Sequence, residues 1–127
     1  MAEIKENKLK VAVSSKGKNL GNEVSDVFGR SPYFIIVEIE DGEIKRTEII
    51  ENKSTEQMSG AGISAAQLMA EKNVNAVITG NVGPRAFDVL NQFNIGIYVG
   101  DGTIEKVLQE FIDRKLKKTK EGKCPKI

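Results

Sequence analysis

Small residues gather in three segments that connect the predicted strands and helices. Residues 77–87, VITGNVGPRAF, put two glycines and a proline between a β-branched run and a helical pattern. Residues 60–62, GAG, precede a second helical pattern, and the loop 14–22 follows an apolar strand. Helix N-termini and small residues expose backbone N–H groups that bind anions. The three segments predict a pocket for an anion, or for an electron-rich oxygen or sulfide surface.

Basic side chains near these segments would add positive charge to such a pocket. They are Lys16, Lys18, Arg30 and Arg85. Each motif also has a simpler interpretation, because glycines often serve only to turn the chain and lysines often lie on solvated loops. Both interpretations stay open for each motif taken alone. Convergence of the three segments at one edge of a sheet favours a ligand.

The composition excludes most kinds of catalytic site and metal site. The chain of 127 residues contains no histidine and one cysteine, Cys124, which we expect to be an exposed thiol. These counts exclude a serine–histidine triad and leave a tetrahedral zinc site almost without ligands. Metal chemistry would need carboxylates, Met58, a second subunit, or a cluster bound through its own non-protein groups. The candidate carboxylates Asp26, Asp88 and Asp101 show no pairing for acid–base work, so we expect no enzyme.

Charge and hydropathy restrict the partners and the location. The net charge of +1 gives no basic footprint for nucleic acid or for an acidic membrane. No apolar run approaches the ~20 residues of a membrane span. The N-terminal stretch MAEIKENKLK is polar and lacks the apolar part of a signal peptide. We expect a cytoplasmic protein with neither nucleic acid nor membrane as a partner.

Residue periodicity predicts the element order β-β-β-α-β-α-β-α. Strands are expected over residues 9–13, 33–40, 43–50, 75–79 and 95–99, and helices over 60–73, 83–94 and 103–112. The expected buried stripes of the helices are Ile63, Ala66 and Ala70; Ala86, Val89, Leu90 and Phe93; and Ile104, Val107, Leu108, Phe111 and Ile112. Residues 1–127 are predicted to form one domain with its core over about 9–114. The polar tail, 115–127, is expected to be helical at first and then mobile.

This order predicts an α/β fold with a mixed five-stranded sheet and flanking helices. Asp41 and Gly42 indicate a hairpin, and the charged strand after them suits a sheet edge. Ligands of such sheets bind beyond the carboxyl ends of the strands, where the strand order reverses. If the first and fourth strands are neighbours, the three small-residue segments meet there.

Five stretches spanning about residues 9–114 carry a family resemblance: KVAVSS, VSDVFGRSPYFIIVEIEDGEI, GAGISAAQLM, VNAVITGNVGPRAFDVLNQFNIGIYV and TIEKVLQEFI. In this order they resemble the dinitrogenase iron–molybdenum cofactor biosynthesis family, the domain of NifX- and NafY-type accessory proteins that also ends NifB-type proteins. The resemblance implies a ribonuclease-H-like fold. It also implies binding of iron–sulfur-type cofactor precursors during their assembly and transfer.

Carried onto this sequence, the resemblance places the pocket in the loops 14–15, 25–30, 58–62 and 79–84. The residues expected to hold a cofactor are Ser14, Ser15, Arg30, Met58, Gly60, Gly62, Thr79, Gly80, Asn81 and Gly83. Cluster-binding members tend to carry histidine or cysteine near the GAG segment. In this chain the segment is TEQMSGAG, where Met58 is the soft donor.

Three functions remain as hypotheses. The first is a non-catalytic carrier or accessory protein that transiently binds an iron–sulfur or iron–molybdenum-type cofactor or its precursor. It would be a monomer or weak dimer with cofactor-assembly proteins as partners. The alternative is a metal-free module that binds a small anionic metabolite or a protein in the same crevice. The third is an enzyme acting on a phosphorylated or carboxylated small molecule, which would depend on Asp26.

Overall fold

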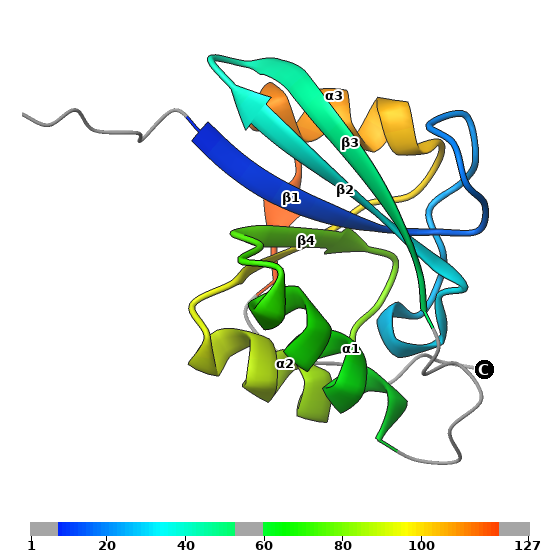
Figure 1. The fold of residues 1–127 in the computed structure, drawn as a ribbon, viewed down its shortest axis with the longest axis vertical. Helices are drawn as coiled ribbons and strands as arrows, with labels where there is room; N and C mark the ends of the chain where they lie inside the picture. Colours follow the sequence, from blue (N-terminus) through cyan, green and yellow to red (C-terminus); the bar gives the residue numbers. More distant parts are fainter. Residues whose placement is uncertain (1–7, 53–59, 120–127) are drawn as a thin grey trace, which may run out of the picture.

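The computed structural model describes residues 8–52 and 60–119, which form six strands and three α-helices (Figure 1). The strands are β1 (Lys8–Ser15), β2 (Tyr33–Glu40), β3 (Glu43–Glu51), β4 (Ala76–Thr79), β5 (Gly96–Val99) and β6 (Lys117–Lys118). The helices are α1 (Ala61–Glu71), α2 (Pro84–Gln92) and α3 (Ile104–Ile112), and a short 3₁₀ turn, η1, covers Phe28–Arg30. The mixed α/β class expected from the sequence is confirmed.

The strands form one mixed sheet in the order β3-β2-β1-β4-β5-β6. β1 is antiparallel to β2 and parallel to β4, and β4 is parallel to β5. The expected adjacency of the first and fourth strands is therefore confirmed, as is the edge position of β3. Because β1 and β4 run in parallel, their carboxyl ends, at Ser15 and Thr79, lie at the same edge of the sheet.

The prediction of five strands is wrong, and so is the prediction that the tail begins as a helix. α3 ends at Ile112, and Arg114 adopts a left-handed φ of 62° that stops the helix. The chain then turns back so that β6 pairs antiparallel with β5. A strand of two lysines has no alternation and little strand propensity, so sequence patterns could not reveal it.

The helices cover both faces of the sheet, α1 and α2 on one and α3 on the other (Figure 1). The alternating side chains of the central strands supply both cores. Ala12, Phe34, Ile36, Val77 and Ile97 pack with α1 and α2, whereas Val11, Val13, Ile35, Val37 and Ile78 pack with α3. A period of two along each strand thus divides the apolar residues between two helical layers.

Two of the predicted helix stripes are partly wrong. α1 buries Ala61, Ala65, Ala66 and Met69, while Ile63 is only half-buried. Small or apolar residues lie around most of the circumference of α1, so its sequence does not indicate which side is buried. Phe93, expected at the end of the α2 stripe, is 52% exposed because the helix ends one residue earlier.

Local sequence signals were accurate at the ends of several elements. Asp41 and Gly42 have φ values of 55° and 80°, as a two-residue hairpin turn of type I′ requires. Thr103 caps α3, its Oγ1 accepting a 3.3 Å hydrogen bond from the backbone nitrogen of Lys106. Among the described helices, none has the length and apolar character needed to cross a membrane.

Candidate functional site

A network of buried hydroxyl groups joins the carboxyl ends of β1 and β4. Ser14 Oγ lies 2.8 Å from Thr79 Oγ1, to which it donates, and 3.2 Å from the carbonyl oxygen of Ser25. Ser14 and Thr79 are almost fully buried. Burying a hydroxyl group is costly unless it is hydrogen-bonded, so this contact stabilises the junction of the two strands.

A second serine pair fixes the end of η1 against β1. Ser31 Oγ accepts a 2.9 Å hydrogen bond from the backbone nitrogen of Ser15 and donates to the carbonyl oxygen of Tyr33 at 2.6 Å. The Oγ atom of Ser15 donates a hydrogen bond to the carbonyl oxygen of Gly17, also at 2.6 Å. These contacts hold the segment that follows η1 close to the carboxyl end of β1.

The loop between β4 and α2 supports the segment before η1. A Cβ on Gly80 would lie 2.8 Å from the carbonyl oxygen of Asp26, so the missing side chain lets two backbones approach. Asn81 accepts a 3.0 Å hydrogen bond from the backbone nitrogen of Phe28 through its carbonyl oxygen. This loop therefore anchors η1 and the segment before it.

Close backbone contacts also bring η1, α1 and α2 together. A Cβ on Gly29 would lie 2.6 Å from the Cα atom of Gly62 and 2.6 Å from its nitrogen. A Cβ on Gly62 would lie 3.1 Å from the Cβ atom of Ala86 in α2. The glycines at these two positions permit the first turns of both helices to approach η1.

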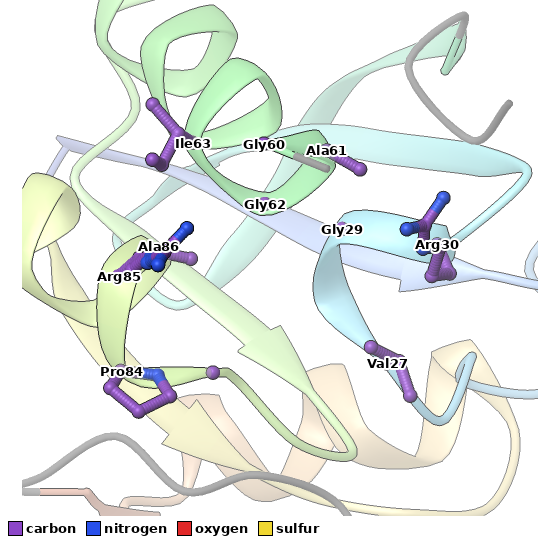
Figure 2. A pocket seen from close by; sticks show the side chains of 11 residues that line it. Val27, Gly29, Arg30, Gly60, Ala61, Gly62, Ile63, Pro84, Arg85 and Ala86 are labelled. Atoms are coloured by element: carbon purple, nitrogen blue, oxygen red, sulfur yellow. The ribbon is translucent and has the colours of Figure 1, made fainter. Parts of the chain in front are cut away.

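Between these three elements lies a pocket of about 400 Å³, which Figure 2 shows from close by. Its volume falls within the range of roughly 300–1,000 Å³ that is typical of ligand pockets. The described residues lining it are Val27, Gly29, Arg30, Gly60, Ala61, Gly62, Ile63, Gly83, Pro84, Arg85 and Ala86.

The described residues that line this pocket contribute positive charge and hydrogen-bond donors. The first turns of α1 and α2 line it. Their N-cap residues, Gly60 and Gly83, have no side chain that could accept hydrogen bonds from the first-turn N–H groups. First-turn N–H groups have no partner within their own helix and carry the positive end of the helix dipole. Arg30 and Arg85, both exposed, lie on opposite sides of Gly62 in Figure 2. No carboxylate is among the described lining residues.

Sequence comparison identifies the family. Residues 7–114 match the family model described as dinitrogenase iron-molybdenum cofactor. The chain belongs to the dinitrogenase iron–molybdenum cofactor family. The resemblance read from the sequence motifs is thereby confirmed over nearly the same span.

Relatives of this family share both sequence and fold with the chain. The uncharacterized protein MJ0580 of Methanocaldococcus jannaschii is 45% identical over 98 residues, covering 76% of this chain and 83% of that protein. The apo form of the orange protein of Desulfovibrio gigas is similar in structure, with a TM-score of 0.83 at 29% identity over 91% of this chain and 97% of that one. The protein MJ0327 of M. jannaschii has a TM-score of 0.72 at 28% identity, covering 90% and 97% of the two chains.

The structure separates the site residues expected from the family into three groups. Arg30, Gly60, Gly62 and Gly83 line the pocket. Ser14, Ser15, Thr79, Gly80 and Asn81 are not among its described lining residues and make the internal contacts given above. Met58 lies outside the described residues. A role of any of these residues in binding stays a prediction.

Ile63 and Ala86 line the pocket although the sequence suggested only packing roles for them. Both lie in the first turn of a helix, where the backbone N–H groups have no partner within the helix. Glycine-rich segments just before two helices were the available signal. That signal marks the helix ends without showing which first-turn residues face the pocket.

The side chains of the described lining residues favour one kind of ligand for this pocket. Residues 8–52 and 60–119 contain no group of three or more aspartate, glutamate or cysteine side chains placed to hold a metal ion, and the chain has no histidine. Among the described lining residues the polar side chains are those of Arg30 and Arg85, whose guanidinium groups donate hydrogen bonds and do not ligate metals. This set fits an anion, or a cluster that presents its own sulfide or other anionic groups.

Proposed function

We propose that the protein is a non-catalytic carrier or accessory protein that binds an iron–sulfur or iron–molybdenum-type cofactor, or a precursor of one, as its cargo. The observation that carries this proposal is the convergence of two helix N-termini and two arginines, Arg30 and Arg85, on one pocket. The described lining includes no carboxylate that would repel an anion or act as an acid or base.

Outer-sphere contacts would hold such a cargo. Backbone N–H groups in the first turns of α1 and α2 donate hydrogen bonds to the sulfur atoms at the periphery of a cluster. The guanidinium groups of Arg30 and Arg85 compensate its negative charge from two sides. Aliphatic surface from Val27, Ile63 and Pro84 contacts the rest of its surface and excludes water.

Binding of this kind suits a carrier. A cluster held without protein ligands on its metal atoms leaves without breaking a metal–protein bond, so it can pass to another protein. The family's description names the iron–molybdenum cofactor, and the similar orange protein is known in an apo form, which is the state without a bound group. Cofactor-assembly proteins are the partners that such a function requires.

A co-elution experiment tests the proposal. The protein is mixed anaerobically with a synthetic iron–sulfur cluster carrying thiolate outer ligands and is passed through a gel-filtration column. We expect visible absorbance of the cluster to elute with the protein and to resist competition by an excess of inorganic phosphate. Absence of co-eluting absorbance would contradict the proposal. Displacement of the cluster by phosphate would instead indicate a module for small anionic metabolites.

A further inference from the structure

The side chain of Asn52 bridges two carbonyl groups on either side of Arg30. Asn52 directly follows β3 and is 3% exposed. Its Nδ2 donates to the carbonyl oxygen of Ser31 at 2.8 Å and to that of Gly29 at 3.3 Å. The Gly29 carbonyl belongs to the peptide group that links Gly29 to Arg30, so Asn52 holds the peptide from which the arginine emerges.

The backbone of Asn52 is itself fixed in place. Its N–H group donates a 2.9 Å hydrogen bond to the carbonyl oxygen of Pro32, the residue just before β2. A side chain that is anchored at its own backbone and buried loses little further entropy when it makes its hydrogen bonds. The amide of Asn52 is therefore a rigid support rather than a surface group that happens to lie near η1.

η1 needs such a support because it has little stability of its own. It is a three-residue 3₁₀ turn, a form whose hydrogen bonds have poor geometry. Phe28 anchors its first residue by packing on Phe34, with ring centroids 5.2 Å apart. Gly29, next in the turn, has no side chain with which to anchor the peptide before Arg30.

We propose that Asn52 is a positioning residue of the pocket, which fixes the direction of Arg30 through the carbonyl groups of Gly29 and Ser31. The inference rests on the proposed function of the pocket. Asn52 is not among the described residues lining the pocket, so it acts through Arg30 rather than on the cargo itself. A preorganised arginine loses less conformational freedom on binding, and the affinity for an anion rises accordingly.

A double-mutant cycle separates this role from a general structural role. The probe is the synthetic iron–sulfur cluster with thiolate outer ligands, titrated anaerobically. We expect Asn52→Ala to raise the Kd by about fivefold in the wild-type background and in Arg85→Ala, and to change it little in Arg30→Ala. Loss of a general structural support would raise the Kd in all three backgrounds, and that result would overturn the inference.

A matched control comes from Asn75, whose Oδ1 accepts a 2.8 Å hydrogen bond from the backbone nitrogen of Lys10. Asn75 precedes β4, at the opposite end of this strand from Thr79. Asn75→Ala also removes a hydrogen bond between an asparagine side chain and the backbone, at an exposed position away from the pocket, and should leave the Kd unchanged. If Asn52→Ala fails to fold, the milder Asn52→Ser takes its place in the cycle.

A second measurement needs no cluster, so it distinguishes failure of this inference from failure of the proposed function. Backbone ¹⁵N order parameters report the rigidity of the Arg30 amide in the free protein. We expect them to fall at Arg30 in Asn52→Ala and to stay unchanged there in Asn75→Ala. Unchanged order at Arg30 in Asn52→Ala would overturn the positioning role, whether or not the wild-type protein binds the cluster.

Discussion

The backbone of Gly62 occupies the space that a side chain at Gly29 would need, since a Cβ there would lie 2.6 Å from the Cα and nitrogen atoms of Gly62. Gly29 belongs to η1 and Gly62 to the first turn of α1, and both line the pocket. Their contact sets the separation of two pocket walls.

Replacing Gly29 by alanine should destabilise the fold. The obstructing atoms belong to a helix backbone and cannot move aside as a side chain would, so η1 and α1 must separate. We expect Gly29→Ala to lower the free energy of unfolding by about 2–3 kcal/mol. Urea unfolding followed by circular dichroism measures the change. An unchanged midpoint would mean that the two walls are not in close contact.

Gly83→Ala is the matched control, with a different expectation. Nothing lies within 4 Å of a Cβ at this position, and its φ of −72° and ψ of 165° suit alanine. We expect the free energy of unfolding to change by less than about 1 kcal/mol, because the lost freedom of the unfolded chain opposes the lower preference of alanine for the N-cap position. The same urea experiment measures it, and a clear loss of stability would contradict the open position of Gly83.

Thr79→Val tests whether the hydroxyl network is structural. Valine keeps the shape of threonine but removes the 2.8 Å acceptor of the buried Ser14 hydroxyl group, which keeps its longer contact with the carbonyl oxygen of Ser25. We expect the free energy of unfolding to fall by about 0.5–1.5 kcal/mol. The affinity for the cluster should stay the same, as measured by anaerobic titration. Weaker binding at unchanged stability would show instead that Thr79 contacts the ligand.

The double variant Ser14→Ala/Thr79→Val supplies the internal control for this pair. Once the threonine hydroxyl is gone, Ser14 Oγ has already lost its 2.8 Å contact, so removing it costs less than it does in the wild-type protein. We therefore expect the double variant to lose less stability than the sum of the two single variants. Simple additivity would mean that the 2.8 Å contact contributes nothing of its own.

The arginines at the pocket rim should contribute separately to binding. We expect Arg85→Ala and Arg30→Ala each to raise the Kd for the synthetic cluster by about three- to tenfold, with a weaker dependence of affinity on salt. Arg46→Ala is the control, because Arg46 is exposed on β3 and does not line this pocket. Equal effects of all three substitutions would indicate nonspecific attraction to positive charge.

Most of the fold could be predicted because burial follows the period of each element. Alternation in β1 and β2 and the apolar spacing in α3 set which side chains reach the two cores. β6 could not be predicted, since its two lysines pair with β5 only after Arg114 has turned the chain back. Residues 117–118 form a strand because of this tertiary pairing, which no local sequence pattern indicates.

The site was predicted less completely, for a different physical reason. Glycine-rich segments before α1 and α2 correctly indicated helix ends at one edge of the sheet. Serine and threonine at that edge, such as Ser14 and Thr79, have hydroxyl groups that suit a ligand or a partner strand equally well. Only the register of β1 against β4 shows that these two hydroxyl groups meet each other.

Amide chemical shifts during an anaerobic titration test the central claim most directly. The ¹⁵N-labelled protein is titrated with the synthetic iron–sulfur cluster while visible absorbance is recorded on the same samples. We expect saturable shifts at Arg30, Gly62, Ile63, Arg85 and Ala86, with absorbance saturating at the same ratio and no shift around Asn75. Shifts confined to another surface, or no shifts at a large excess of cluster, would contradict this claim.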